Sequence, residues 1–369
     1  MSHLNKFDHF LSDAGPAALV IREALMPVEG ADGVLFPATY ASGDGFPGGY
    51  NIDKLDGADS GANVCLVDSV GSQANRIEPM FAEEPYKSLV PQIVVKAGEK
   101  EVNILEAGHR AGDAIVRCSD LEETLRNAFK SVLKGDAEPL AKIAPTSLVF
   151  GVWDSRDTQA KLPRLVSSTI RAFNVRKLTR SAQFVPAVEY VAEQLLEEPG
   201  DNTTTKKAYA ERGFIHVPAT GSHGGVIATG GIRRDAALSL AALRLLFAGK
   251  DTAKTLTLRR YILGLALVAF TRNPSGYLRQ GCLLVLDPDQ AGKNQFVEVH
   301  PDGKRVPSKI TADSALEYAK EAAAVFGVGE ARTVPFDKAR ALKDIKGEGD
   351  SKTKGKKGKK GDASGDQSK

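Results

Sequence analysis

The chain has 369 residues, of which 42% are hydrophobic and 26% charged, a composition typical of a globular protein with one large domain or two ordinary ones. Its formal net charge is only +3, so the overall charge does not by itself indicate a nucleic-acid-binding protein. Three widely spaced cysteines without a CxxC pair argue against a disulfide framework and a zinc site. The polar N-terminal segment predicts no signal peptide, and the longest apolar run, 261–270, is too short to cross a bilayer. We therefore expect a soluble protein of the reducing cytoplasm.

The N-terminal part of the chain predicts a strand, a long loop and a helix. In residues 17–28 the side chains alternate between two sides, which predicts a strand. Residues 29–63 are rich in Gly, Asp and Pro, which predicts a long loop or insertion. Residues 67–81 predict a short helix with Asp68 or Ser69 as its cap.

The next elements lead into a basic region. Residues 91–118 contain three short β-like runs and predict a hairpin-rich segment, and residues 120–134 predict an amphipathic helix. Residues 146–153 predict a buried strand. After it, Ser167 or Ser168 is expected to cap a helix.

The C-terminal half predicts alternating strands and helices, followed by a tail. Its elements are a strand that turns helical and acidic (182–198), a strand (213–217), a glycine-rich strand with a helix (221–249), a helix or strand whose start and length favour a helix (255–270), a strand (277–286) and a helix (311–326). From about residue 346 the chain is a lysine- and glycine-rich low-complexity sequence. We expect a folded part, 1–345, and a disordered, solubilising tail, 346–369.

Positive charge is concentrated between residues 156 and 180. The segment holds seven basic side chains and one acid, Asp157: Arg156, Lys161, Arg164, Arg171, Arg176, Lys177 and Arg180. A helix capped at Ser167 or Ser168 would expose its first amide groups, with Arg171 on the face of the serines. Hydroxyls, amides and arginines at a helix start predict a phosphate site, and a solvated basic helix start is the alternative.

A glycine-rich stretch, 221–235, is a second candidate site. Its glycines are followed by two arginines at the expected helix start: Gly224, Gly225, Gly230, Gly231, Arg233 and Arg234. Glycines allow positive φ and close backbone approach, so loop amides and arginines can surround a polyanion. Neither the P-loop pattern nor GxGxxG is present, and a tight turn between strand and helix is the alternative.

Two further features point to one anion-binding face. The stretch 226–282 holds nine basic residues against two acids, while acids gather around 189–198. The helix 67–81 presents Ser72, Gln73 and Arg76 on one side, which is either a second polyanion contact or an ordinary solvated face.

Enzyme chemistry has little support in the sequence. The six histidines lack metal-binding spacing, no GxSxG motif is present, and we expect no metal and no cofactor. Asp154 and Asp157 flank the basic segment and are suited to position a metal or a 2′-hydroxyl, or else to orient Arg156 or cap a turn.

Several segments together resemble one protein family. LVDSVGSQANRIEPMF, FGVWDSRDTQAKLPRLVSSTIRAFNV, RSAQF, GGIRRDAALSLAALRLL and LRRYILGLALVAF are similar to the backbone subunit of type I-G (earlier I-U) CRISPR effector complexes. That subunit belongs to the "seven" family of the RAMP superfamily. The similarity runs from about residue 17 to 286, and SxxSQANRxE and WDSRxTQAKLPR are its most specific pieces.

The resemblance implies an α+β fold with an RRM-like (ferredoxin-like) βαββαβ palm, large insertions and a β-hairpin thumb, for which 91–118 is our candidate. It implies RNA-backbone contacts at Ser72, Gln73, Asn75, Arg76, Lys161, Arg164, Ser167, Ser168, Arg171, Gly224, Gly225, Gly230, Gly231, Arg233 and Arg234, with Arg156 and Arg176 as neighbouring candidates. The aromatic motif of ordinary RRM sheets is not evident, so we expect a grip on the RNA backbone without base stacking.

The implied function is a non-catalytic subunit that oligomerises along a CRISPR guide RNA (crRNA) and presents it for pairing with target DNA in antiviral defence. The implied partners are the guide, further copies of the chain, a large subunit, a guide-processing or capping subunit and a recruited helicase-nuclease, with no membrane. One alternative is a type III-like subunit that cleaves target RNA with Asp154 or Asp157. Another is a metabolic enzyme that uses 221–235 for a phosphorylated cofactor.

Overall fold

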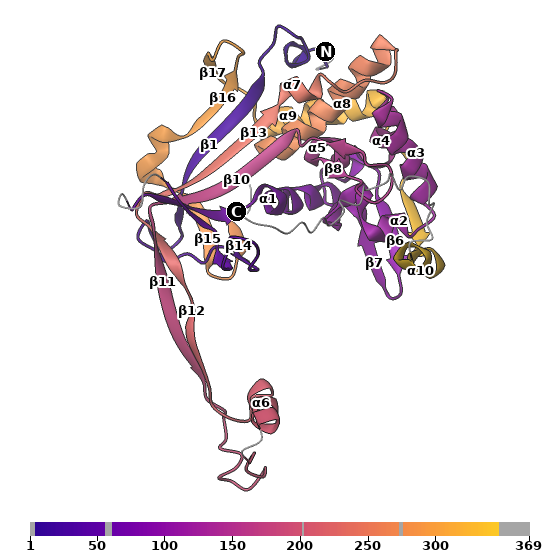
Figure 1. Ribbon diagram of the computed structural model, residues 1–369. Coiled ribbons are helices and arrows are strands. Elements are labelled where there is room, and N and C mark those ends of the chain that lie inside the picture. Colours follow the sequence, from indigo (N-terminus) through magenta and orange to yellow (C-terminus); the bar gives the residue numbers. More distant parts are fainter. Residues whose placement is uncertain (1–3, 56–60, 201–202, 273–275, 347–369) are drawn as a thin grey trace, which may run out of the picture.

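A curled antiparallel sheet runs through the centre of the computed structural model, which describes residues 4–55, 61–200, 203–272 and 276–346 (Figure 1). The strand order is β14-β15-β1-β13-β10-β5-β4, and β16 and β17 continue the sheet beside β1. The bounds are β1 Ala18–Pro27, β4 Ile52–Lys54, β5 Asn63–Asp68, β10 Val166–Phe173, β13 Ile232–Ser239, β14 Tyr277–Arg279, β15 Cys282–Leu286, β16 Gln295–Val299 and β17 Arg305–Pro307. The expected α+β class is confirmed.

The two central strands, β10 and β13, alternate strictly between two faces of the sheet. In β13 every second side chain from Ile232 to Leu238 is buried, and the residues between them are partly open. The register pairs Ser168 with Ala236, and Arg171 with Arg233. Directly paired residues point to the same face, so Ser168 faces the core and Arg171 lies on the open face.

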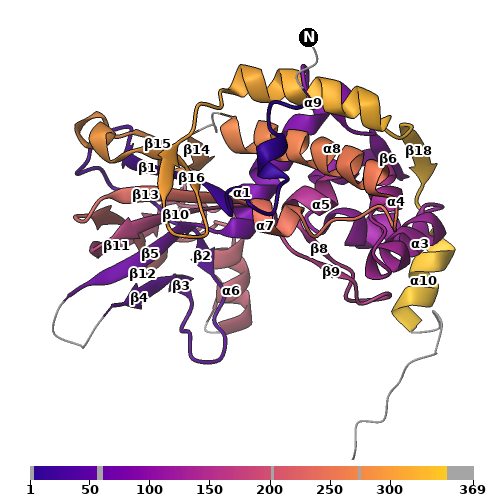
Figure 2. The same cartoon turned by 90° about the horizontal axis from the view of Figure 1, so that it is seen from above.

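Helices cover the core-facing side of the sheet. They are α1 Val70–Ile77, α5 Thr146–Phe150, α7 Leu240–Leu243, α8 Thr252–Thr271 and α9 Ala312–Phe326. Figure 2 shows α9 lying along α8, which leaves the middle of α8 buried on nearly every side. Gly264 makes this possible, because a Cβ at that position would lie 2.9 Å from the Cα of Ala319. None of the described helices is long and apolar enough to cross a bilayer.

A second group of helices lies beside the sheet with a small three-stranded sheet. Its elements are α2 Ala114–Arg117, α3 Glu122–Leu133, α4 Glu138–Ile143, α10 Lys338–Lys346, β6 Ile93–Ala97, β7 Lys100–Asn103 and β18 Arg332–Pro335. Short 3-10 turns link the elements: η1 Asp8–Phe10, η2 Glu78–Ala82, η3 Lys87–Leu89, η4 Ile104–Glu106, η5 Arg110–Gly112 and η6 Pro288–Lys293.

Three two-stranded units complete the chain. They are β2 Thr39–Tyr40 with β3 Gly49–Tyr50, β8 Val152–Trp153 with β9 Lys161–Leu162, and β11 Val175–Phe184 with β12 Val217–Ala228. The β11–β12 ribbon projects away from the body and carries α6 (Thr203–Glu211) beyond its far end (Figure 1). The segment 91–118, our candidate thumb, instead forms the β6–β7 hairpin, 3-10 turns and α2, packed against the helices.

Five secondary-structure predictions are wrong in whole or in part. The strand expected over 213–217 is turn and bend as far as His216, and the helical part expected within 182–198 is a series of turns after β11. The helix expected after Ser167 or Ser168 is strand β10, the strand expected over 146–153 is mostly α5, and the helix expected before Gly249 is largely strand β13. For the two strands the partner elements decide the outcome, because β10 lies between β13 and β5, and β13 lies between β1 and β10. The strand at 17–28 and the helices within 67–81, 120–134, 255–270 and 311–326 are confirmed.

Candidate nucleic-acid interface

Helix α1 is attached to the sheet through the carboxylate of Asp68, at the end of β5. Asp68 is fully buried and accepts hydrogen bonds from Ser72 Oγ (2.9 Å), Gln73 Nε2 (2.6 Å) and Arg76 Nε (3.3 Å). Arg279 Nη2 donates to it from β14 at 2.7 Å. A carboxylate with this many donors, two of them cationic, is well compensated for its burial. From the sequence, Asp68 is predicted only as a candidate helix cap.

The same network includes Ser168 of β10. Ser168 Oγ donates to Gln73 Oε1 at 3.0 Å, and both side chains are buried. Ser69 caps the helix: its hydroxyl accepts a hydrogen bond from the Ser72 amide at 3.2 Å. Ser69 is one of the two caps predicted from the sequence. Ser72, Gln73 and Ser168, all expected to contact RNA, thus make hydrogen bonds that position α1.

Asn75 contacts a buried ion pair that the sequence did not reveal. Arg110 is 3% exposed, and its Nη2 donates to Asn75 Oδ1 at 3.2 Å while its Nη1 donates to the Gly151 carbonyl at 3.3 Å. Its Nε lies 2.5 Å from Glu78 Oε2. Burial raises the pKa of Glu78 to about 7, although the Arg110 charge acts in the opposite direction.

Arg164 lies beside this pair and beside the start of α1. Its Cγ and its amide nitrogen are 2.9 and 3.0 Å from where a Cβ on Gly151 would lie, so only glycine fits there. Its Nη2 is 4.0 Å from the corresponding position on Gly71, in the first turn of α1. Partial burial and the nearby Arg110 guanidinium lower the pKa of Arg164. The Arg164 guanidinium adds positive charge beside the N-terminus of α1, which favours an anion there. Arg110 lies toward the other end of the helix, against Asn75 and Glu78.

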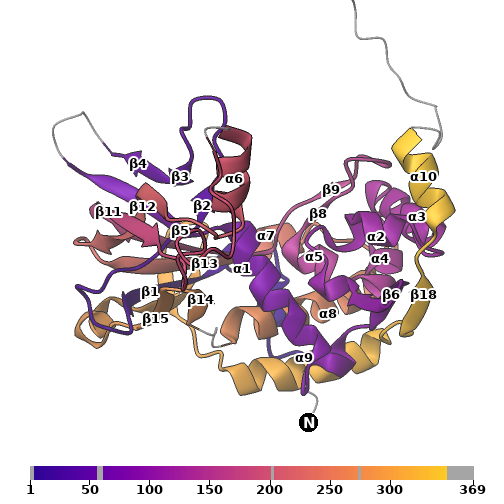
Figure 3. The ribbon, with the colours of Figure 1, turned by 90° about the horizontal axis from the view of Figure 1, so that it is seen from below.

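The β8–β9 hairpin extends this surface. Trp153 on β8 pairs with Lys161 on β9, and the Lys161 Nζ lies 5.5 Å from the centroid of the indole ring. Arg156 is exposed in the connecting loop. Within the described residues, Arg156, Lys161 and Arg164 have no carboxylate within ion-pairing distance. Figure 3 shows this hairpin and α1 on either side of α5.

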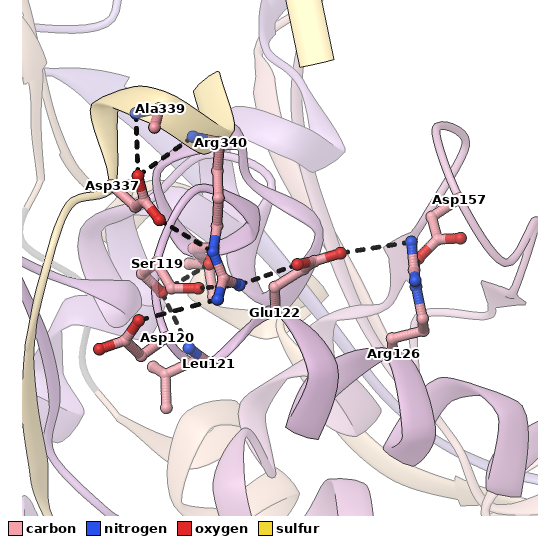
Figure 4. Close-up of polar contacts among 10 residues, drawn as sticks. Ser119, Asp120, Leu121, Glu122, Arg126, Asp157, Asp337, Ala339 and Arg340 are labelled. Atoms are coloured by element: carbon pink, nitrogen blue, oxygen red, sulfur yellow. Dashed lines mark hydrogen bonds and ion pairs between the residues drawn. The ribbon is translucent and has the colours of Figure 1, made fainter. Parts of the chain in front are cut away.

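The two aspartates of the loop maintain its shape. Asp154 is buried, and its Oδ2 accepts from the Thr158 amide (2.9 Å) and hydroxyl (2.6 Å), so it caps a turn as one alternative predicted. Asp157 pairs with Arg126 of α3 at 2.5 Å. Figure 4 shows that Glu122 links this pair to α10. Its Oε1 lies 3.3 Å from Arg126 Nη2, and its Oε2 lies 2.8 Å from Arg340 Nη1. The loop is thereby connected to α3 and α10.

Other predicted residues lie on the open face of the sheet. Ser167 and Arg171 face the same side, and the Arg171 Nη1 donates to Thr169 Oγ1 at 2.8 Å. Arg233 binds both carboxylate oxygens of Asp235 and lies 4.8 Å from the Phe173 ring centroid. A groove of about 980 Å³ between β1, the β12–β13 turn and η6 is lined in part by Phe173 and Arg233.

Arg234 does not share that face. It is 5% exposed on the side opposite Arg233, and its Nε donates to Glu23 Oε2 at 2.6 Å. Both arginines were expected at a helix start, whereas alternation along β13 places them on opposite faces of the sheet.

Three of the predicted glycines, Gly224, Gly225 and Gly230, allow close packing, and Gly231 takes a positive φ with no close neighbour. A Cβ on Gly224 would lie 2.7 Å from the Thr179 carbonyl carbon, and one on Gly225 would lie 2.5 Å from Val34 Cγ1. Gly231 has φ +82°, and a Cβ on Gly230 would lie 2.8 Å from the Phe173 carbonyl oxygen. The stretch is thus a tight turn, as the alternative predicted, but it joins two strands.

Replacing Gly230 with valine is expected to lower the free energy of unfolding by about 1–3 kcal/mol, because the side chain meets the Phe173 backbone. Gly43→Val is the matched control, since a Cβ there has no neighbour within 4 Å. Urea denaturation monitored by circular dichroism measures both variants. Equal stability of the two would contradict the packing role.

The predicted residues thus separate into two surfaces. The hairpin surface consists of Arg156, Lys161 and Arg164 with Asn75 and Arg76 of α1. The sheet surface consists of Ser167, Arg171, Arg233 and the turn at Gly230 and Gly231. Arg176 is exposed at the base of the β11–β12 ribbon. In the described part of the chain, no group of three or more His, Cys, Asp and Glu side chains is arranged to hold a metal ion.

Comparison with known protein families identifies a CRISPR-associated family that part of the chain matches. Residues 19–177, from β1 into the first residues of β11, match the model of the family described as CRISPR-associated protein GSU0053 (Cas_GSU0053). No curated protein matches the chain. The matched stretch contains the hairpin surface and α1. This part of the chain is therefore similar to a CRISPR-associated protein family, which supports a role in CRISPR-Cas defence.

Proposed function

We propose that the chain is a non-catalytic guide-RNA-binding subunit of a CRISPR effector complex of type I-G. Several copies assemble along one guide RNA and leave its bases available for pairing with target DNA. A subunit that must accept any guide sequence binds phosphate and sugar, because these groups carry no sequence information.

The observation that carries the proposal is the hairpin surface itself. Arg156, Lys161 and Arg164 project from one hairpin without carboxylate partners among the described residues, and all three lie in the matched stretch. Arg164 also lies beside Arg110 and the first turn of α1. Surface cations are usually balanced by nearby acids, so an unbalanced group around a helix N-terminus suits a polyanion.

The strand arrangement supports an RRM-like palm. In the sheet, β15, β1, β13 and β10 are neighbours in that order, which are the fourth, first, third and second strands of a βαββαβ unit. Helix α1 lies between the first and second strands in the chain, and α8 lies between the third and fourth. The projecting β11–β12 ribbon is our candidate for the thumb, in place of 91–118.

We propose no catalytic role for Asp154 or Asp157. Asp154 is buried and holds Thr158, and Asp157 is paired with Arg126, so both carboxylates stabilise the loop that carries Arg156. In this proposal a recruited helicase-nuclease cuts the target. A large subunit and a guide-processing or capping subunit complete the assembly.

The test compares two triple variants that remove equal charge. The hairpin variant is Arg156→Gln/Lys161→Gln/Arg164→Gln, and the control, on and beside β17, is Lys304→Gln/Arg305→Gln/Lys309→Gln. Binding of labelled single-stranded RNA is measured by fluorescence anisotropy at several salt concentrations. For single strands, loss of three phosphate contacts is expected to reduce the slope of log K against log salt by about 2. The control is expected to keep the wild-type slope.

Equal slopes and affinities for the two variants would contradict the proposal that the hairpin surface holds phosphate. Absence of RNA binding by the wild-type chain would contradict the proposed function as a whole. Weakening by the hairpin variant is expected to be similar for unrelated RNA sequences, because phosphate contacts do not distinguish bases.

A further inference from the structure

We infer that Trp153 is a stacking platform for a base of the bound single-stranded RNA. The inference rests on the proposed function and departs from the expectation that the chain contacts only the RNA backbone. Trp153 is the single tryptophan of the chain, and it is 57% exposed on β8. Single exposed apolar residues are common on protein surfaces, so exposure alone does not indicate a binding role for Trp153. The residues around the indole do.

The surroundings of the indole are cationic. Lys161 lies directly opposite on β9 with its Nζ 5.5 Å from the ring centroid. Arg156 follows three residues later in the loop, and Arg164 lies just beyond β9. None of the three has a carboxylate partner among the residues that the structure describes. An aromatic ring among unbalanced cations suits a ligand that is both aromatic and anionic, as a nucleotide is.

The backbone of the β8–β9 hairpin that carries Trp153 is held by contacts with η5 and α3. Val152 is buried, and the hairpin backbone lies so close to η5 that a Cβ on Gly112 would be 3.3 Å from the Trp153 carbonyl oxygen. At the start of the loop the Asp154 amide donates to the Ala160 carbonyl at 2.9 Å. The Asp157–Arg126 pair connects the loop to α3. Because the backbone that carries Trp153 is fixed in advance, little backbone entropy is lost when a base stacks on the ring.

The nearby cations determine which part of the nucleotide each group contacts. Arg164, beside the first turn of α1, is placed to hold a phosphate, and Trp153, on the adjoining strand, is placed to take the neighbouring base. Every base has a π-face, so stacking tolerates any guide sequence. A protein partner is less suitable, because an exposed aromatic residue ringed by cations offers no continuous apolar surface to bury.

The single tryptophan makes the test direct, because emission excited at wavelengths that tyrosine does not absorb comes from Trp153 alone. The chain is titrated with oligouridylate and with an abasic sugar-phosphate oligomer of the same length, while anisotropy of a labelled copy of each reports binding. Oligouridylate is expected to quench the tryptophan emission by more than half. The abasic oligomer is expected to bind and to leave most of the emission.

Substitution provides a second readout. Trp153→Leu is expected to weaken oligouridylate binding about 5- to 150-fold, the range measured for loss of one stacked base. Trp153→Phe is expected to restore most of the affinity, and both variants are expected to bind the abasic oligomer as the wild type does. Tyr277→Leu, which removes an aromatic side chain of similar exposure (55%), is the matched control.

Several results would overturn the inference. RNA binding with unchanged emission, or equal quenching by the abasic oligomer, would show that no base stacks on the ring and would leave the proposed function standing. A blue shift that grows with protein concentration in the absence of RNA would assign Trp153 to a contact between copies of the chain. Failure to bind either oligomer would overturn both the inference and the proposed function.

Discussion

Asp68→Ala is expected to lower the free energy of unfolding by about 3–5 kcal/mol, the range for breaking a buried ion pair by removing one partner. The substitution leaves the Arg279 guanidinium and the Gln73 amide without their buried acceptor. Helix α1 then loses its attachment to β5 and β14. Urea denaturation of the purified chain measures the loss.

Arg76→Gln is the control for this prediction. Arg76 also binds Asp68, but its side chain is 38% exposed and its contact is 3.3 Å long. Exposed ion pairs contribute about 0–1 kcal/mol, so this variant is expected to stay near wild type. A loss below 1 kcal/mol for Asp68→Ala would contradict the anchoring role of this carboxylate.

Arg110→Met is expected to lower the free energy of unfolding by about 3–5 kcal/mol at pH 8, because the Glu78 carboxylate then remains buried without its cation. The loss is expected to be smaller at pH 5, where the Glu78 carboxyl is protonated and needs no counter-charge. Denaturant titrations at the two pH values measure the difference. An equal loss at both pH values would contradict the pairing as the cause.

The pH dependence of the wild-type chain has a definite sign. The pKa of Glu78 is raised by burial from an ordinary value of 4.5 to about 7 in the folded chain. Between these values the folded chain binds more protons than the unfolded chain. The contribution of Glu78 to stability is therefore fully present below about pH 4.5 and is lost as the pH rises through about 7. Glu78→Gln, the control for Arg110→Met, is expected to remove this component.

Both buried carboxylates lie under the hairpin surface. Asp68 holds Ser72, Gln73 and Arg76 of α1, and Glu78 holds Arg110, which contacts Asn75 and lies close to Arg164. Most of the motif SxxSQANRxE is therefore accounted for by interactions that fix helix α1 at its start and at its end. In the proposed function, the groups that meet RNA are the neighbouring side chains that this network leaves free.

The sequence by itself determined the elements whose signals are local. Strand β1 and helices α1, α3 and α9 follow from hydrophobic periodicity, α1 also from its Ser69 cap, and α8 from its start and length. The concentration of cations between residues 156 and 180 is likewise a property of the sequence. These features depend on residues within one or two turns of each other, so no distant contact was needed to predict them.

Only the tertiary structure decided that the central segments are strands, and on which face of the sheet each of their side chains lies. The alanine- and leucine-rich sequence of β13 favours a helix locally, but its position between β1 and β10 provides hydrogen bonds on both edges and makes it a strand. Alternation along the strands then buries Ser168 and Arg234 and leaves Arg171 and Arg233 on the open face. The roles of Asp68 and Arg110 depend on partners such as Arg279 and Gly151, which are distant in the chain. Long-range pairing of this kind has no local periodicity, and this is the physical reason that it became visible only in the folded chain.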